Sequence, residues 1–130
     1  MTYIGSKLCR SSMSMKQQYA ETARLTEIKR PGATLMFADT AFYQDNQYLI
    51  EYSFAESPYD VINGQSNTSF FMVPSIHFRH YGSANIGWVD GHVEAKPMAK
   101  PVLGDNYTAE MAKMNIGWFE PVDNTLFDLE

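Results

Sequence analysis

The 130-residue sequence contains a single cysteine, Cys9, and no long apolar run. One cysteine excludes an internal disulfide and a cysteine-based metal cluster. No stretch approaches the ~20 apolar residues of a membrane-spanning helix, and the N-terminus has no basic and apolar signal pattern. Basic residues are also scarce, since 10 Lys and Arg stand against 15 Asp and Glu and give a net charge of −5. Nucleic acid and anionic lipid are therefore disfavoured as partners, because both are bound through Lys and Arg.

Common catalytic signatures are missing as well. The sequence has no Gly-x-Ser-x-Gly motif, and its glycines form neither a dinucleotide-binding pattern nor a Walker pattern. Hydrophobic residues make up 45% of the chain and aromatic residues 14%, which is ample for one core. We therefore expect a single domain over residues 1–130 that is not an enzyme and has no catalytic, cofactor-binding or metal-ligating residues.

The most informative segment is 79–93. Asp90-Gly91 lies between two short apolar runs, and Asp-Gly favours a two-residue type I′ turn in which both residues have positive φ. A hairpin closed there pairs Trp88 with Val93. That register sorts the side chains into an apolar and a polar face: Ile86, Trp88, Val93 and Ala95 against His92 and Glu94.

Other segments predict an antiparallel sheet. Residues 33–39 form an almost unbroken apolar run, residues 48–54 alternate as a half-buried strand does, and residues 69–73 indicate a further strand. Residues 56–68 are rich in Ser, Asn, Gly and Pro and predict a long surface loop. The expected fold is α+β, with an antiparallel sheet of about four to six strands and short helices.

Both ends of the chain are expected to carry a little helix. A weak helical stripe runs through 11–29, and Asp105 or Asn106 is expected to cap a short helix that extends to about Asn115. The C-terminal segment is too apolar for a free tail. We expect four of its side chains to pack on the body: Trp118, Phe119, Leu126 and Phe127.

Three histidines raise a second interpretation. His77 and His80 have His-x-x-His spacing, and imidazole and carboxylate groups are usual zinc ligands. A small metal-assisted hydrolase or a carbohydrate-binding domain would use His77, His80 and Asp90 together with exposed aromatic residues. In a strand, however, residues three apart point to opposite faces. We therefore favour structural roles, with His80 half-buried beside a backbone carbonyl or a carboxylate and Asp90 as a turn residue.

Two motifs carry a resemblance to a known family. The first is Arg79-His80 followed by nine residues and Asp90-Gly91-His92-Val93, with Asn85 and Trp88 between them. The second, in residues 28–39, runs Ile-x-x-Pro, small residues, an apolar strand and Asp39. Over roughly residues 1–97 the chain resembles the bacterial prepilin-type, processing-associated pseudopilin family, which has a His-nine-residue-Asp-Gly motif near the C-terminus.

The resemblance implies a pseudopilin-like globular head that acts by assembly in a type II secretion or pilus-like system, without enzymatic activity. Its partners would be other pilin-like subunits or an exported protein, met through the first edge strand and the 56–68 loop. Its location would be extracytoplasmic, on a membrane-anchoring N-terminal helix. That leader and helix are not in this sequence, so we expect the head without its anchor. The motif residues are His80, Asn85, Trp88, Asp90, Gly91 and His92.

The resemblance also raises calcium as a cofactor. Related secretion pseudopilins bind calcium in a C-terminal loop, and hard oxygen ligands are what calcium prefers. Residues of that type near the C-terminus here are Asp105, Asn106, Asp123, Asn124 and Asp128. They do not have EF-hand spacing, and solvated loop acids are the simpler interpretation.

Overall fold

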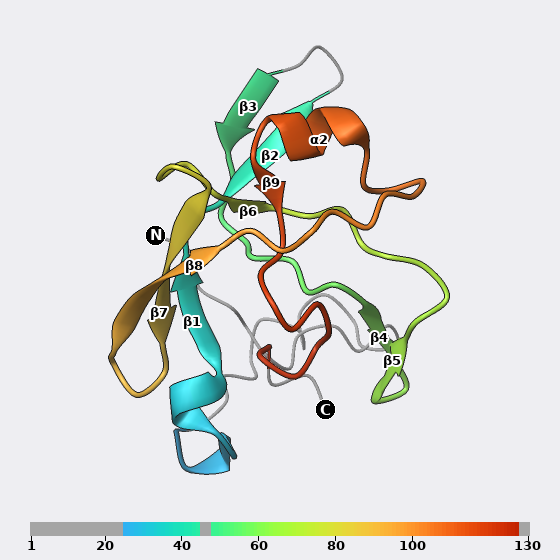
Figure 1. The fold of residues 1–130 in the computed structure, drawn as a ribbon. Coiled ribbons are helices and arrows are strands. Elements are labelled where there is room, and N and C mark those ends of the chain that lie inside the picture. The colour runs from blue at the N-terminus through green and yellow to red at the C-terminus, as the bar shows by residue number, and fades with distance from the viewer. Residues whose placement is uncertain (1–24, 45–47, 128–130) are drawn as a thin grey trace.

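The computed structural model describes residues 25–44 and 48–127, which form a β-rich α+β fold (Figure 1). Most of the expected helical stripe in 11–29 lies outside this part of the chain, and so does Asp128. In chain order the elements are η1 (Leu25–Glu27), η2 (Pro31–Ala33), β1 (Leu35–Ala38), β2 (Ala41–Gln44), β3 (Tyr48–Glu51), β4 (Asp60–Ile62), β5 (Gln65–Asn67), β6 (Ile76–His77), β7 (Ser83–Trp88), β8 (Val93–Pro97), α2 (Ala109–Lys113) and β9 (Ile116–Gly117).

The strands pair in four separate antiparallel units within the described residues. The largest has the order β1-β7-β8, and the others are the pairs β2-β3, β4-β5 and β6-β9. The expected single sheet of four to six strands is therefore wrong. The chain leaves β1 at Asp39, whose backbone is bonded to Asn85 and to His77, and only an isolated bridge between Thr40 and Ile76 continues beyond it. The ladder is therefore interrupted at this point, and the strand pairs do not join into one sheet.

The core lies on the inner face of β1-β7-β8, against the C-terminal segment (Figure 1). Along β7 the side chains alternate, and Ala84, Ile86 and Trp88 are buried. Trp118, Phe119 and Phe127 are buried too, and Leu126 packs against them, so the predicted return of the C-terminal segment is confirmed. The remaining members of the cluster are Leu35, Ala38, Ala55, Ile76, Phe78 and Tyr107.

The β7-β8 hairpin differs from its prediction by one residue. Only Gly91 has positive φ (95°), and its N–H donates to the Trp88 carbonyl at 2.9 Å. The loop therefore contains three residues, with a type I turn followed by a left-handed glycine. Val93 therefore pairs with Gly87 and not, as predicted, with Trp88. The predicted type I′ turn and register are wrong, although a tight reversal at these positions and the burial of Trp88 are confirmed.

Tertiary hydrogen bonds hold the longer loop. The N–H of Val89 donates to the Thr34 carbonyl (3.0 Å), and the N–H of Asp90 donates to the Pro31 carbonyl (3.2 Å). These bonds tie the loop to the segment before β1. Because one extra residue enters the loop, β8 turns over, and the Val93 side chain is 69% exposed rather than packed beside Trp88.

A type I′ turn does occur, in the segment that was expected to be a loop. Ile62 and Gln65 are paired across Asn63-Gly64, where φ is 53° and 79°. Positive φ at both central residues defines this turn, and Asn-Gly is the dipeptide that favours it. The 56–68 segment is therefore partly the hairpin β4-β5.

Three other expectations need correction. The apolar face of 48–54 is not half-buried, because Tyr48 is 66% and Phe54 57% exposed in the absence of a covering layer among the described residues. Residues 69–73 contain no strand. The short helix α2 is capped by the Thr108 hydroxyl, which accepts from the Met111 N–H, and not by residue 105 or 106. No helix within residues 25–44 and 48–127 has the length and apolarity needed to cross a membrane.

Candidate functional site

The two sequence motifs meet at the hairpin loop. Besides accepting the Asp90 N–H, the Pro31-Gly32 segment leaves room for the Asp90 carboxylate, because a Cβ on Gly32 would lie 2.9 Å from Asp90 Oδ2. Asp90 Oδ1 accepts from the His92 backbone N–H (3.1 Å) and lies 2.6 Å from His92 Nδ1. These bonds, the backbone one foremost, hold the pKa of Asp90 below its usual value. The loop is thus fixed from both motifs.

Trp88 lies directly behind this loop. Its ring is buried, packs edge-on against Phe119 with centroids 6.3 Å apart, and is stacked by the His92 ring at 5.7 Å. The Lys96 ammonium lies 5.8 Å from the Trp88 ring centroid. Trp88 therefore closes the core, with His92 and Lys96 covering its outer side.

The motifs meet a second time at Asp39, just after β1. Asp39 Oδ2 lies 3.1 Å from His80 Nε2 and accepts the Asn85 backbone N–H at 2.9 Å. The His80 side chain is 51% exposed and that of Asp39 24%. Of the two partners expected for His80, a backbone carbonyl or a carboxylate, the structure has the carboxylate. The Asn85 side chain is exposed on the outer face of the sheet.

The residues of the metal-hydrolase interpretation do not come together. His80 precedes β7 and Asp90 follows it, so the two lie at opposite ends of that strand. Burial, followed by the charge of Arg79, lowers the pKa of His77, whose buried Nδ1 has no hydrogen-bond partner among the described residues. No three His, Cys, Asp or Glu residues in the described chain gather in a group that could hold a metal ion.

Three of the residues considered for calcium, Asn106, Asp123 and Asn124, bond other groups of the protein. Asp123 Oδ1 accepts from the Thr125 backbone N–H and hydroxyl, and Asn124 bonds the Tyr59 backbone through both its amide oxygen and its amide nitrogen. The Asn106 amide donates to the Phe71 carbonyl. These side chains hold loops to the body of the domain.

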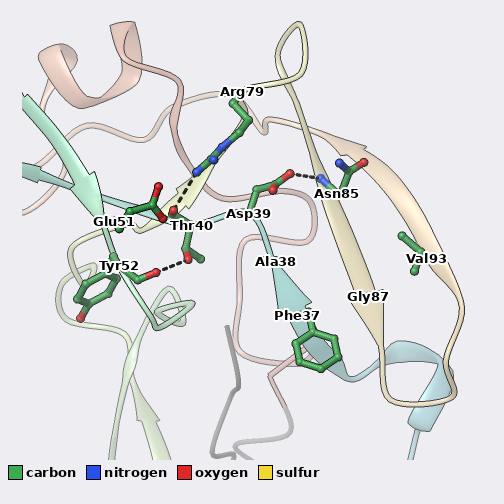
Figure 2. A pocket seen from close by; sticks show the side chains of 10 residues that line it. All are labelled: Phe37, Ala38, Asp39, Thr40, Glu51, Tyr52, Arg79, Asn85, Gly87 and Val93. Atoms are coloured by element: carbon green, nitrogen blue, oxygen red, sulfur yellow. Dashed lines mark hydrogen bonds between the residues drawn. The ribbon is translucent and has the colours of Figure 1, made fainter. Parts of the chain in front are cut away.

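An open pocket of about 340 Å³ lies beside Asp39, between the outer face of β1-β7-β8 and the β2-β3 hairpin (Figure 2). Six of its lining residues carry the chemistry considered below: Phe37, Asp39, Glu51, Arg79, Asn85 and Val93. Arg79 donates to the Thr40 carbonyl at 3.0 Å, and the Thr40 hydroxyl donates to the Tyr52 carbonyl at 2.7 Å, which joins the two walls.

Sequence reasoning missed most of this pocket. Asp39 and Asn85 belong to the motifs, and Arg79 adjoins His80, but Phe37 and Glu51 carry no spacing signal. They meet only because β1, β3 and β7 converge.

Comparisons with known proteins add no relative: no family model, no curated protein and no solved structure matches this chain significantly.

Proposed function

We propose that this domain is the globular head of a pseudopilin-like subunit, which acts by assembly and protein recognition in a bacterial secretion or pilus-like system and catalyses no reaction. In the full protein the head would be carried outside the cytoplasmic membrane on an N-terminal helix. The observation that carries the proposal is the double contact between the two motifs on which the resemblance rests.

These motifs are some fifty residues apart in the sequence, yet they are neighbours at both ends of the β1-β7 pair. Pro31 and Gly32 receive Asp90, and Asp39 receives His80 and the Asn85 backbone. The Asp39 and Asp90 carboxylates thus each accept a backbone N–H, and the His80 and His92 rings pair with these carboxylates. Because these groups bond within the protein, we infer that the motifs fix the scaffold of the head, which supports a structural role for them.

The β8 strand supplies a surface for partners. At the opposite edge of the sheet, the free edge of β1 is covered by other segments. The Leu35 N–H donates to the Leu126 carbonyl, and the Asp39 carbonyl accepts from the His77 N–H. The contact expected at the first edge strand therefore moves to β8, which no described strand pairs on its outer side. Unpaired strand edges are common places for a second chain to dock. Pro97 ends this edge because it has no N–H to donate.

Site-specific cross-linking tests the proposal in cells that express the gene with its native upstream sequence. A photoreactive residue at Ala95, exposed on β8, is compared with one at Val102, which is 50% exposed outside the strands. We expect Ala95, but not Val102, to cross-link to a protein with a pilin-type N-terminal segment, and the upstream frame to encode such a segment. Equal labelling at the two positions, or stoichiometric zinc with hydrolytic activity in the purified protein, would contradict the proposal.

A further inference from the structure

The pocket beside Asp39 has an apolar floor that depends on one glycine. Phe37 pairs with Gly87 across β1 and β7, and a Cβ at Gly87 would lie 3.3 Å from Cδ2 of the Phe37 ring. With a side chain at Gly87 the ring would have to give by a few tenths of an ångström, so the glycine lets the ring lie close against the sheet. Val93, paired with Gly87 on the other side, extends this floor. Figure 2 shows Phe37 and Val93 bordering the hollow from β1 and β8.

Charged groups of both signs border this apolar floor. Asp39 and Glu51 carry carboxylates, and Arg79 carries a guanidinium. Two of these groups are held in place by the protein itself. The Arg79 guanidinium is anchored on the Thr40 carbonyl, and Asp39 Oδ2 on the Asn85 N–H and on His80. A guanidinium has five N–H donors and a carboxylate two oxygens, so each retains bonding capacity toward the pocket.

This combination decides between classes of ligand. Two carboxylates against one guanidinium disfavour an anion such as phosphate, which needs a surplus of donors. A simple cation is disfavoured as well, because the positive Arg79 guanidinium lines the same pocket and would repel it. A neutral molecule with several hydroxyl groups can donate to the carboxylates and accept from Arg79 and from the Asn85 amide, so it uses every group. A molecule with an apolar ring face also covers Phe37.

We propose that this pocket binds a neutral saccharide, whose ring packs on Phe37 and whose hydroxyls bond Asp39, Glu51, Arg79 and Asn85. The saccharide site differs from the site of the hydrolase interpretation, since its lining contains none of His77, His80 and Asp90, although His80 bonds the Asp39 carboxylate. It does not rest on the pseudopilin-like assembly proposed above, so either proposal can fail alone. Because the pocket is open, a single sugar would bind weakly, with a Kd on the order of 1 mM.

Titration of the ¹⁵N-labelled protein with D-glucose, D-galactose, D-mannose and N-acetyl-D-glucosamine tests the proposal. At least one sugar is expected to shift amide resonances that cluster at residues 37–40, 51–52, 79, 85–87 and 93. Shifts located elsewhere, or none with any of the four sugars, would overturn it. The same shifts with L-lysine or L-arginine at lower concentration would overturn the neutral ligand class.

Two variants and a matched control locate the site. Glu51→Gln keeps the shape of an exposed side chain and removes its charge, and we expect it to weaken binding about three- to tenfold. Gly87→Ala should weaken binding by displacing the Phe37 ring, without changing a polar group. Glu110→Gln, an exposed carboxylate on α2, should leave the Kd unchanged. Equal effects of Glu51→Gln and Glu110→Gln would refute the site, and thermal melts of each variant check that it is folded.

Discussion

Replacing Gly91 with alanine isolates the backbone strain of the β7-β8 loop. Gly91 has φ of 95°, and an added Cβ would have no atom within 4 Å, so no clash contributes to the cost. What remains is the strain of holding an alanine in the left-handed region, which costs about 1–3 kcal/mol. In a domain of this size each kcal/mol lowers Tm by about 4 °C, so the strain corresponds to roughly 4–12 °C.

A second glycine provides the control. At Gly104 an added Cβ also meets nothing within 4 Å, but its φ does not lie in the left-handed region. There alanine only reduces the entropy of the unfolded chain, and Gly104→Ala should stabilise by about 0.4–1 kcal/mol. The difference between the two variants is therefore the strain at Gly91.

Urea unfolding followed by tryptophan fluorescence measures both variants, because Trp88 and Trp118 are buried in the folded state. Gly91→Asn should lie between wild type and Gly91→Ala, since asparagine tolerates positive φ better than alanine. If Gly91→Ala and Gly104→Ala have the same unfolding free energy, Gly91 does not adopt the left-handed conformation, and the three-residue loop is refuted.

Three further predictions concern the described residues. Because burial lowers the pKa of His77 below its ordinary 6.5, the unfolded chain takes up this proton first, so stability is full above pH 6.5 and falls as the pH drops through that value. His77→Gln should flatten this acid slope in urea unfolding, and an unchanged slope would count against burial of the ring. Burial raises the pKa of Tyr107 from 10.0 to about 12, and its buried hydroxyl has no partner in the described chain. Tyr107→Phe should keep or raise the unfolding free energy, by up to about 1–3 kcal/mol, and should reduce the loss of stability above pH 10.0; a clear loss at neutral pH would reveal an unseen partner. Gly32→Ala should lower Tm in the wild type but not in Asp90→Ala, since its Cβ would press on the Asp90 carboxylate; additive losses in this double-mutant cycle would exclude the contact.

Local patterns predicted those parts of the fold that burial alone decides. The alternation along β7 predicted that Ile86 and Trp88 face inward, and the aromatic C-terminal segment was predicted to pack on the core. The same logic failed at residues 48–54, because alternation says only that two faces differ. Whether another layer covers the apolar face depends on residues far away in the sequence.

The hairpin register failed for a related reason. Asp-Gly suits more than one kind of loop, and the deciding hydrogen bonds come from Pro31 and Thr34, which are more than fifty positions upstream. The pocket was beyond sequence reasoning because Phe37, Glu51 and Arg79 belong to segments with no mutual spacing rule. By contrast, the dipeptide Asn63-Gly64 is itself a hairpin signal, and the segment was predicted as a loop only because the residues around it are polar.

The length of one loop decides which chemistry β8 presents to the outside. With three residues between Trp88 and His92, the Val93 and Ala95 side chains lie on the outer face of the sheet. The His92, Glu94 and Lys96 side chains lie on the same face as Trp88. Removing a single residue there would exchange the two sets along the whole strand, so that His92 and Lys96 would no longer cover Trp88. One codon deletion would in this way replace both the outward-facing surface of β8 and the cover over the indole.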